Sequence, residues 1–424
     1  MDAEKKKFLK NFIWNSIGTG FNSFNSLFFL IIVTRINGTL EAGIFSIAYA
    51  TSTILYTIAM YSGRLCQVTD TKNKIGDKDY ITTRALTCLL MFVGAGIFLA
   101  MRGYAPYKMG VFIALAVFKG IEAFSDVLYG IMQKHDVLYK AGMSLTAKGF
   151  IGLVFFGIIN YFTHNLILAS IALVVINALI LLVYDYLIVS SKLIDKERKL
   201  DFANVKSILK SEFFVFVNSF AGIYILNAPK YAIDGLVSAG EMTEHIQAIY
   251  GYIMMPATVM TLFTQFIVMP VLGKMKELYA ENDLKGITSL TNKIKLIVLA
   301  FGICAVGGAF LLGPEFLGLI YKLDLKPYRM NLCVIIGSYI FYAVSYINLV
   351  TLTTIRHTFV QFVIYVISMV IAFVGSHILV TKYGINGATF SCTTTLALQF
   401  IMYSVTTKVI MHKEQKKIEA NQNS

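Results

Sequence analysis

The sequence predicts an all-α, polytopic membrane protein with twelve transmembrane helices in two six-helix lobes. Hydrophobic residue types make up 57% of the chain and charged types only 14%, which is too apolar for a water-soluble surface. A bilayer-spanning helix needs about 20 mostly apolar residues, and long apolar stretches recur along the whole chain. They do not alternate in polarity over about ten residues, as the strands of a membrane β-barrel do. Helices are therefore the expected element.

Twelve apolar stretches, separated by short polar segments, are the predicted spans. The first is longer than the apolar region of about 7–15 residues in a secretory signal peptide, and it does not end in a small-residue cleavage site. It is therefore expected to remain as a span. The predicted spans are 12–34, 44–62, 83–101, 109–130, 145–162, 166–189, 213–233, 246–272, 294–312, 330–350, 359–380 and 386–408.

Lysine and arginine gather in every second loop. Most of the 37 basic residues lie in the N-terminal segment, in the even-numbered loops and in the C-terminal tail. Because the cytoplasmic loops of membrane proteins carry the excess of lysine and arginine, both termini are predicted to be cytoplasmic. Topology and anionic lipid headgroups then account for the net charge of +13, and nucleic-acid binding is not expected.

A basic segment divides the chain into two halves. We predict an N-terminal lobe over 1–189, a cytoplasmic linker over 190–212 with an amphipathic helix on the inner leaflet, and a C-terminal lobe with its tail over 213–424. The halves begin alike, with Phe8-Leu-Lys-Asn before the first span and Ile208-Leu-Lys-Ser before the seventh. Both halves start inside. The repeat is therefore predicted to be parallel, with a pseudo-two-fold axis along the membrane normal and a central cavity.

The sequence contains no motif that is placed for catalysis, nucleotide binding or metal binding. There is no GxxxxGK[ST], HExxH or GxSxG pattern, and the five cysteines have no metal-ligand spacing. No cofactor is expected, and a proton or sodium gradient is the anticipated driving force. A membrane-embedded polysaccharide polymerase or acyltransferase remains an alternative, although the predicted outer loops are short for holding an acceptor.

The fourth predicted span carries five polar residues at a helical spacing, namely Lys119, Glu122, Asp126, Tyr129 and Gln133. At 100° per residue they share one face. A charge near the bilayer centre costs about 2.5–3.5 kcal/mol on insertion scales, so this face is expected to point into the bundle or into water. One interpretation is a structural ion pair. The favoured one is the polar wall of a transport cavity, with Lys119 binding an anion and Glu122 or Asp126 exchanging a proton.

Other residues are candidates for the same cavity. Arg35 and Lys230 end the first spans of the two halves and would form a basic rim for a phosphate, although long basic side chains at a membrane interface need no function. Arg64 is a candidate at the inner mouth, although topology alone would also explain it. Polar and aromatic stripes on spans one, two, four and ten would contact sugars or would only pack between helices. These candidates are Asn15, Asn22, Tyr49, Tyr56, Gln133, Tyr339 and Tyr342.

The stretch NFIWNSIGTGFNSFNSLFFLIIVTRINGTLEAGIFSIAYA resembles the opening of oligosaccharide-lipid flippases (Wzx-type) of the multidrug/oligosaccharidyl-lipid/polysaccharide exporter superfamily. The matching pattern is Thr34-Arg35, Gly38 and Gly43-Ile44-Phe45-Ser46, and a second match is LYGIMQ at 128–133. The resemblance implies alternating access around a cationic cavity in a bacterial plasma membrane. The implied cargo is an undecaprenyl-pyrophosphate-linked repeat unit for capsule, exopolysaccharide or lipopolysaccharide O-antigen, and Arg35 is the implied pyrophosphate contact. Implied partners are membrane lipids, a polysaccharide polymerase and glycosyltransferases.

The chain departs from the drug-exporting branch of this superfamily at one point. Members of that branch usually carry a functional acidic residue in span one, where this chain has Asn and Ser but no acidic residue. An ion-coupled multidrug exporter of the same fold is therefore the first alternative to the flippase, and not the preferred reading.

Overall fold

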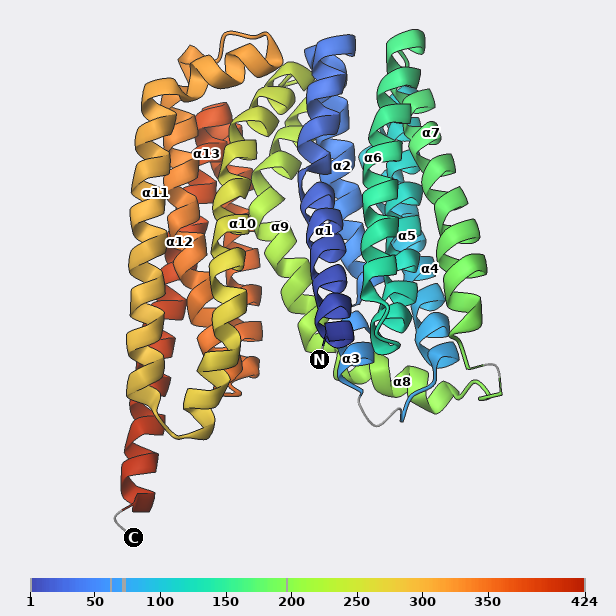
Figure 1. The fold of residues 1–424 in the computed structure, drawn as a ribbon. Helices are drawn as coiled ribbons and strands as arrows, with labels where there is room; N and C mark the ends of the chain where they lie inside the picture. The colour runs from blue at the N-terminus through green and yellow to red at the C-terminus, as the bar shows by residue number, and fades with distance from the viewer. Residues whose placement is uncertain (1, 62, 71–73, 196, 423–424) are drawn as a thin grey trace. The chain divides into compact units, whose positions relative to one another are not determined.

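The computed structural model describes residues 2–61, 63–70, 74–195 and 197–422, and the predicted span over 44–62 and the predicted linker each include a residue outside these ranges (Figure 1). Within them the chain is helical and no strand occurs. Nine described helices are long and apolar enough to cross a membrane, or ten if one bent pair counts as a single span. The all-α membrane class predicted from the sequence is confirmed.

Helices cover every predicted span within the described ranges. The helices are α1 (Asp2–Asn37), α2 (Thr39–Met60), α3 (Gly63–Thr69), α4 (Asp77–Arg102), α5 (Pro106–Lys134), α6 (Leu138–Thr163), α7 (Leu166–Leu179), the π-helix η1 (Ile180–Val189), the short η2 (Ser190–Lys192), α8 (Phe202–Ser211), α9 (Phe213–Ser238), α10 (Glu244–Ala280), α11 (Leu284–Tyr321), the short η3 (Lys326–Tyr328), α12 (Arg329–Thr354) and α13 (Thr358–Gln422).

Two helices explain why fewer than twelve separate apolar spans stand out. α13 contains the eleventh and twelfth predicted spans, and Gly384 interrupts it with φ 59° and ψ −133°. That positive φ is readily available only to glycine. α5 coincides with the fourth predicted span, but Lys119, Glu122 and Asp126 make it more polar than an ordinary membrane helix. The exact number of crossings and the two-lobe arrangement remain predictions.

The chain divides into two compact units. The first comprises Met1–Ile223 and Val237–Ala248, and the second comprises Tyr224–Leu236 and Ile249–Ser424. The helices α9 and α10 each contribute residues to both units. The lobe boundaries at 189 and 213 were predicted from the sequence repeat, and they stay a prediction.

In the first unit, α1 and α6 pack closely through glycines (Figure 1). A Cβ atom on Gly142 would lie 2.4 Å from the backbone carbon of Trp14, and one on Gly18 would lie 2.6 Å from the carbonyl oxygen of Gly142. Small residues permit this approach of two membrane helices. Asn11 Oδ1 accepts a hydrogen bond from the backbone N–H of Tyr139 at 2.9 Å. Part of the polar face of α1 therefore serves helix packing.

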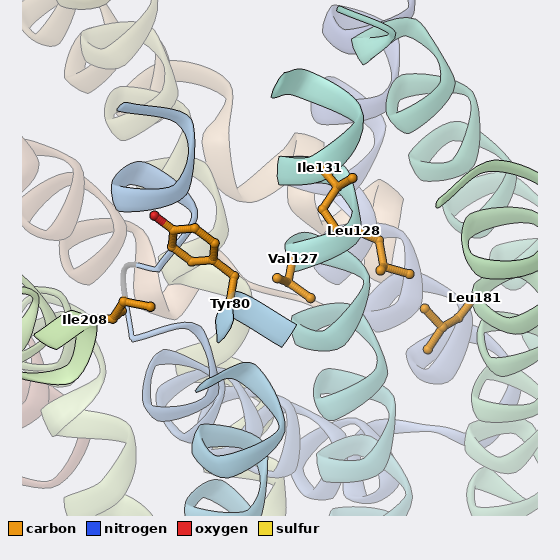
Figure 2. Close-up of a cluster of buried hydrophobic side chains, with 6 residues drawn as sticks. All are labelled: Tyr80, Val127, Leu128, Ile131, Leu181 and Ile208. Carbon is orange, nitrogen blue, oxygen red and sulfur yellow. The ribbon is translucent and has the colours of Figure 1, made fainter. Parts of the chain in front are cut away.

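Apolar side chains cover the other faces of α5, and many of them are buried. Figure 2 shows the resulting cluster, in which α5 meets side chains from α4, η1 and α8. Its members are Tyr80, Val127, Leu128, Ile131, Leu181 and Ile208. Burial of this apolar surface holds α5 in a fixed rotation, so its charged face points in a defined direction.

The amphipathic helix predicted in the linker forms as α8. Asp201 caps it by accepting a hydrogen bond from the backbone N–H of Ala203 at 2.8 Å. Val205 and Ile208 are buried, whereas Phe202 is exposed. The apolar side of the helix therefore packs against protein, notably α4, in addition to any contact with lipid. A bend of 50° separates α8 from α9.

Candidate functional site

Lys119 is held in a cage of aromatic and acidic groups inside the first unit. Its Nζ donates a hydrogen bond to Glu122 Oε2 at 2.6 Å and another to the hydroxyl of Tyr49 at 3.1 Å. The same atom lies 4.7 Å from the ring centroid of Tyr49 and 5.5 Å from that of Tyr56, distances at which a cation is attracted to a ring face. The ion pair expected within α5 is present, and both tyrosines of α2 surround it.

Asp126 has two arginine partners. Arg64 Nη1, from α3, donates to Asp126 Oδ1 at 3.1 Å, and Arg84 Nη2, from α4, donates to Asp126 Oδ2 at 3.1 Å. Arg64 also reaches Gln133 Oε1 at 3.1 Å, and Arg84 reaches the carbonyl oxygen of Ala59 at 2.7 Å. Only 3% of the Arg84 side chain is exposed, against 28% for Arg64. Two guanidinium groups, from α3 and α4, thus hold the Asp126 carboxylate.

A further buried ion pair, which was not predicted, lies beside this row. Lys148 of α6 pairs with Asp185 of η1, and their side chains are 5% and 0% exposed. Lys148 Nζ also donates to Ser125 Oγ at 2.5 Å and to the hydroxyl of Tyr129 at 3.1 Å. All three ammonium hydrogens therefore have acceptors. Asp185 sits in a π-helical segment, a rare backbone form that is frequent at functional sites.

The sequence contained a weak signal for Arg84, Lys148 and Asp185, which were not predicted as site residues. Arg84 and Lys148 fall inside predicted spans but resemble the basic residues that mark cytoplasmic ends, and Asp185 is the acidic residue of an otherwise apolar stretch. Because a charge in an apolar span needs a partner, an unexplained aspartate there indicates a buried cation nearby. The sequence does not say which cation.

The charged row borders a cavity. This cavity of about 160 Å³ is lined in part by Asn22, Tyr56, Glu122, Asp126 and Lys148. At about 30 Å³ for each water, it has room for about five water molecules. Pockets for small organic ligands occupy about 300–1,000 Å³. The row therefore lines a polar interior cavity of the first unit that is smaller than such pockets, and its role as the wall of a transport cavity stays a prediction.

The remaining predicted residues are distributed over both units. In the first unit, Arg35 lies exposed in the last turn of α1, and Asn15 lies on α1 near Gly142. In the second, the rings of Tyr339 and Tyr342 on α12 lie 5.9 Å apart. Tyr339 is buried in the observed conformation. The roles assigned to all these residues remain predictions.

Lys230 differs from the other buried cations. It lies in α9 and is only 7% exposed. Among the described residues, no hydrogen bond or ion pair to its ammonium group is found. A buried charge without a partner is costly, so Lys230 is a natural position for an anionic ligand.

No protein-family model matches the chain. A curated relative, the capsular polysaccharide biosynthesis protein CapF of Staphylococcus aureus, is 24% identical over 402 residues, covering 93% of this chain and 98% of that protein.

Solved transporters share the fold. An inward-facing multidrug resistance MATE family transporter of the MOP superfamily has a TM-score of 0.70 at 11% identity, covering 93% of this chain and 96% of its own. The lipid II flippase MurJ, in an inward closed conformation, has a TM-score of 0.69 at 14% identity, with 95% and 90% covered. A MOP superfamily transporter from Pyrococcus furiosus has a TM-score of 0.58 at 12% identity, with 97% and 96% covered. The chain therefore has the multi-pass membrane fold of the MOP superfamily transporters and of MurJ, which confirms the resemblance expected from its sequence.

Proposed function

We propose that the chain is a flippase that moves an undecaprenyl-pyrophosphate-linked oligosaccharide repeat unit from the cytoplasmic to the outer leaflet by alternating access. The product serves capsule, exopolysaccharide or O-antigen assembly. The protein works in a bacterial plasma membrane with both termini in the cytoplasm, beside a polymerase and the glycosyltransferases that build the repeat unit.

The full-length match to a capsular polysaccharide biosynthesis protein carries this proposal. It supports a role in polysaccharide assembly, and the fold shared with a lipid II flippase supports transport of a lipid-linked sugar as that role. A fold alone does not define a substrate. The charges inside the two units therefore provide the mechanistic part of the argument.

Lys230 is proposed as the principal contact for the pyrophosphate. Its buried ammonium would gain a partner when an anion binds, which offsets the cost of its burial. Arg35 and Arg64 are proposed to assist at the outer and inner ends of the path. Sugar contacts are assigned to Asn15, Asn22, Tyr49, Tyr56, Gln133, Tyr339 and Tyr342.

Lys119 and Glu122 are proposed as the coupling element. In the observed conformation Glu122 neutralises Lys119, so the lysine is not available to an anion. Uptake of a proton by Glu122, which lines the interior cavity, would remove the neutralising charge and free Lys119 for the substrate phosphate. Asp126 is the second candidate, although two arginines hold it. A sodium gradient is the alternative driving force.

Replacing Lys230 tests the proposed binding role. Lys230→Met should leave the protein as stable as wild type or more stable, because it removes an unpaired buried charge. It should nevertheless abolish delivery of repeat units to the surface polysaccharide of a deletion strain. Lys382→Met is the matched control, since Lys382 is exposed, and delivery should be unchanged. Normal polysaccharide in the Lys230→Met strain would reject this residue as the phosphate contact.

The coupling role of Glu122 is tested with two substitutions. Glu122→Asp keeps a titratable carboxyl group and should retain partial delivery, whereas Glu122→Gln should abolish it. Transport driven by an imposed pH gradient in proteoliposomes, with a fluorescent lipid-linked sugar as cargo, gives the direct measurement. Equal rates for the two variants would contradict a titrating role.

A multidrug exporter is the second candidate function, because a MATE transporter has the same fold at a TM-score of 0.70. Cation-dependent efflux of lipophilic dyes from cells that express the chain would favour it. The flippase proposal instead predicts no change in dye efflux and accumulation of a lipid-linked glycan on the inner leaflet when the chain is deleted.

A further inference from the structure

The second unit has a groove of its own, and none of its lining residues has been assigned a role above. This groove, of about 990 Å³, runs between the first turns of α11, the last turns of α12 and the C-terminal part of α13. On α11 the lining residues recur at 285, 288, 292 and 295, and on α13 at 404, 408, 411 and 415. This is the spacing of one helix face, so two faces converge over the end of α12, which packs against both helices (Figure 1).

Basic side chains line the groove, and no acidic residue is among those that line it. Lys285 and Lys295 come from α11, and Lys408 and His412 come from α13. Within the described residues, none of the three lysines forms a hydrogen bond or an ion pair. Other lysines of the chain, such as Lys119 and Lys148, are neutralised by carboxylates. The groove therefore has an uncompensated positive charge.

A buried hydroxyl beside the groove also lacks a partner. Thr407 Oγ1 makes no hydrogen bond, and Thr407 lines the groove. A hydroxyl without an acceptor favours an anionic oxygen nearby. Asn348 donates its amide hydrogen to Ser404 Oγ at 3.2 Å, which fixes the orientation of both side chains.

Apolar side chains complete the groove, and they distinguish a lipid from a soluble anion. Leu284, Val409 and Met411 line it together with the lysine stems. The groove lies at the helix ends that the distribution of basic residues places on the cytoplasmic side, where the headgroups of anionic lipids reside. An amphipathic ligand would satisfy both parts, with its phosphate on the lysines and an acyl chain on the apolar wall.

We infer that this groove binds the phosphate headgroup of an anionic glycerophospholipid from the inner leaflet. The site is independent of the proposed flippase function, because none of its residues belongs to the proposed transport path. Occupancy would tie the ends of α11 and α13 together through one phosphate group.

The inference is tested by lipid retention on the purified full-length chain. Protein in mixed micelles with equal amounts of phosphatidylglycerol and phosphatidylcholine is analysed by native mass spectrometry. Each lysine near an anionic headgroup is expected to contribute about five-fold in affinity, so Lys295→Gln with Lys408→Gln should lower phosphatidylglycerol affinity about 25-fold. Lys295→Arg with Lys408→Arg should keep it, which separates loss of charge from loss of folding.

A matched control removes the same charge from the same helices. Lys293 and Lys413 are exposed and do not line the groove, so Lys293→Gln with Lys413→Gln should change affinity less than two-fold. Four results would overturn the inference. The first two are an equal loss of phosphatidylglycerol affinity in the two Gln pairs and equal retention of phosphatidylglycerol and phosphatidylcholine. The other two are release of bound phosphatidylglycerol by millimolar inorganic phosphate and its displacement by undecaprenyl phosphate at a concentration below that of phosphatidylglycerol.

Discussion

The buried pair Lys148–Asp185 provides the sharpest test of the interior charges. The two side chains are 5% and 0% exposed, so the Asp185 carboxylate cannot be solvated if Lys148 is removed. Lys148→Met leaves the Asp185 carboxylate without its cation. Breaking a buried pair in this way costs about 3–5 kcal/mol. We therefore expect that loss in the free energy of unfolding.

The double variant Lys148→Met with Asp185→Leu should recover most of this loss. It removes both charges and retains similar volumes, and such replacements are often neutral or stabilising. The neighbours keep partners of their own, because Tyr129 bonds to Ser144 at 2.9 Å and Ser125 donates to the carbonyl oxygen of Ile121 at 2.9 Å. We expect the double variant to lie within about 1 kcal/mol of wild type, the size of one ordinary hydrogen bond.

Equilibrium unfolding of the purified protein in mixed detergent micelles measures these differences. The wild type, both single variants and the double variant are compared as a cycle. A double variant that loses the sum of the two single losses would refute the reasoning, since the two charges would then not be stabilising each other. A Lys148→Met variant as stable as wild type would refute it equally.

Two further predictions concern stability. Gly142→Ala should destabilise the protein by about 1–3 kcal/mol, as overpacking does, because the new Cβ would lie 2.4 Å from the backbone of Trp14. Gly20→Ala, where nothing lies within 4 Å, is the control, and equal melting temperatures for the two variants would contradict the close packing of α1 on α6. Arg84→Lys should lower the free energy of unfolding more than Arg64→Lys does, because Arg84 is almost fully buried. The two terminal nitrogens of its guanidinium group donate to Asp126 and to a backbone carbonyl, an arrangement that a lysine cannot reproduce. A larger loss for the Arg64 variant in denaturant titration would show that Arg64 is the main partner of Asp126.

The charged face of α5 could be predicted from the sequence because it depends on local properties. Helical spacing places Lys119, Glu122 and Asp126 on one side, and the cost of ions in lipid turns that side inward. The Lys119–Glu122 pair also needs only one helix. The partners of Asp126 could not be predicted in this way, since Arg64 and Arg84 lie 62 and 42 residues away along the chain.

The sequence by itself determined that this chain is a bundle of membrane helices and where those helices lie, because apolar length and charge spacing are read along a single segment. It did not determine which charges meet. Arginine and lysine near a cytoplasmic helix end look alike whether they face anionic lipids or a buried aspartate, and only packing distinguishes Arg84 and Lys148 from the basic residues of the loops. The size of the interior cavity was likewise decided by the tertiary structure, since it is the volume that side chains from several helices leave unfilled.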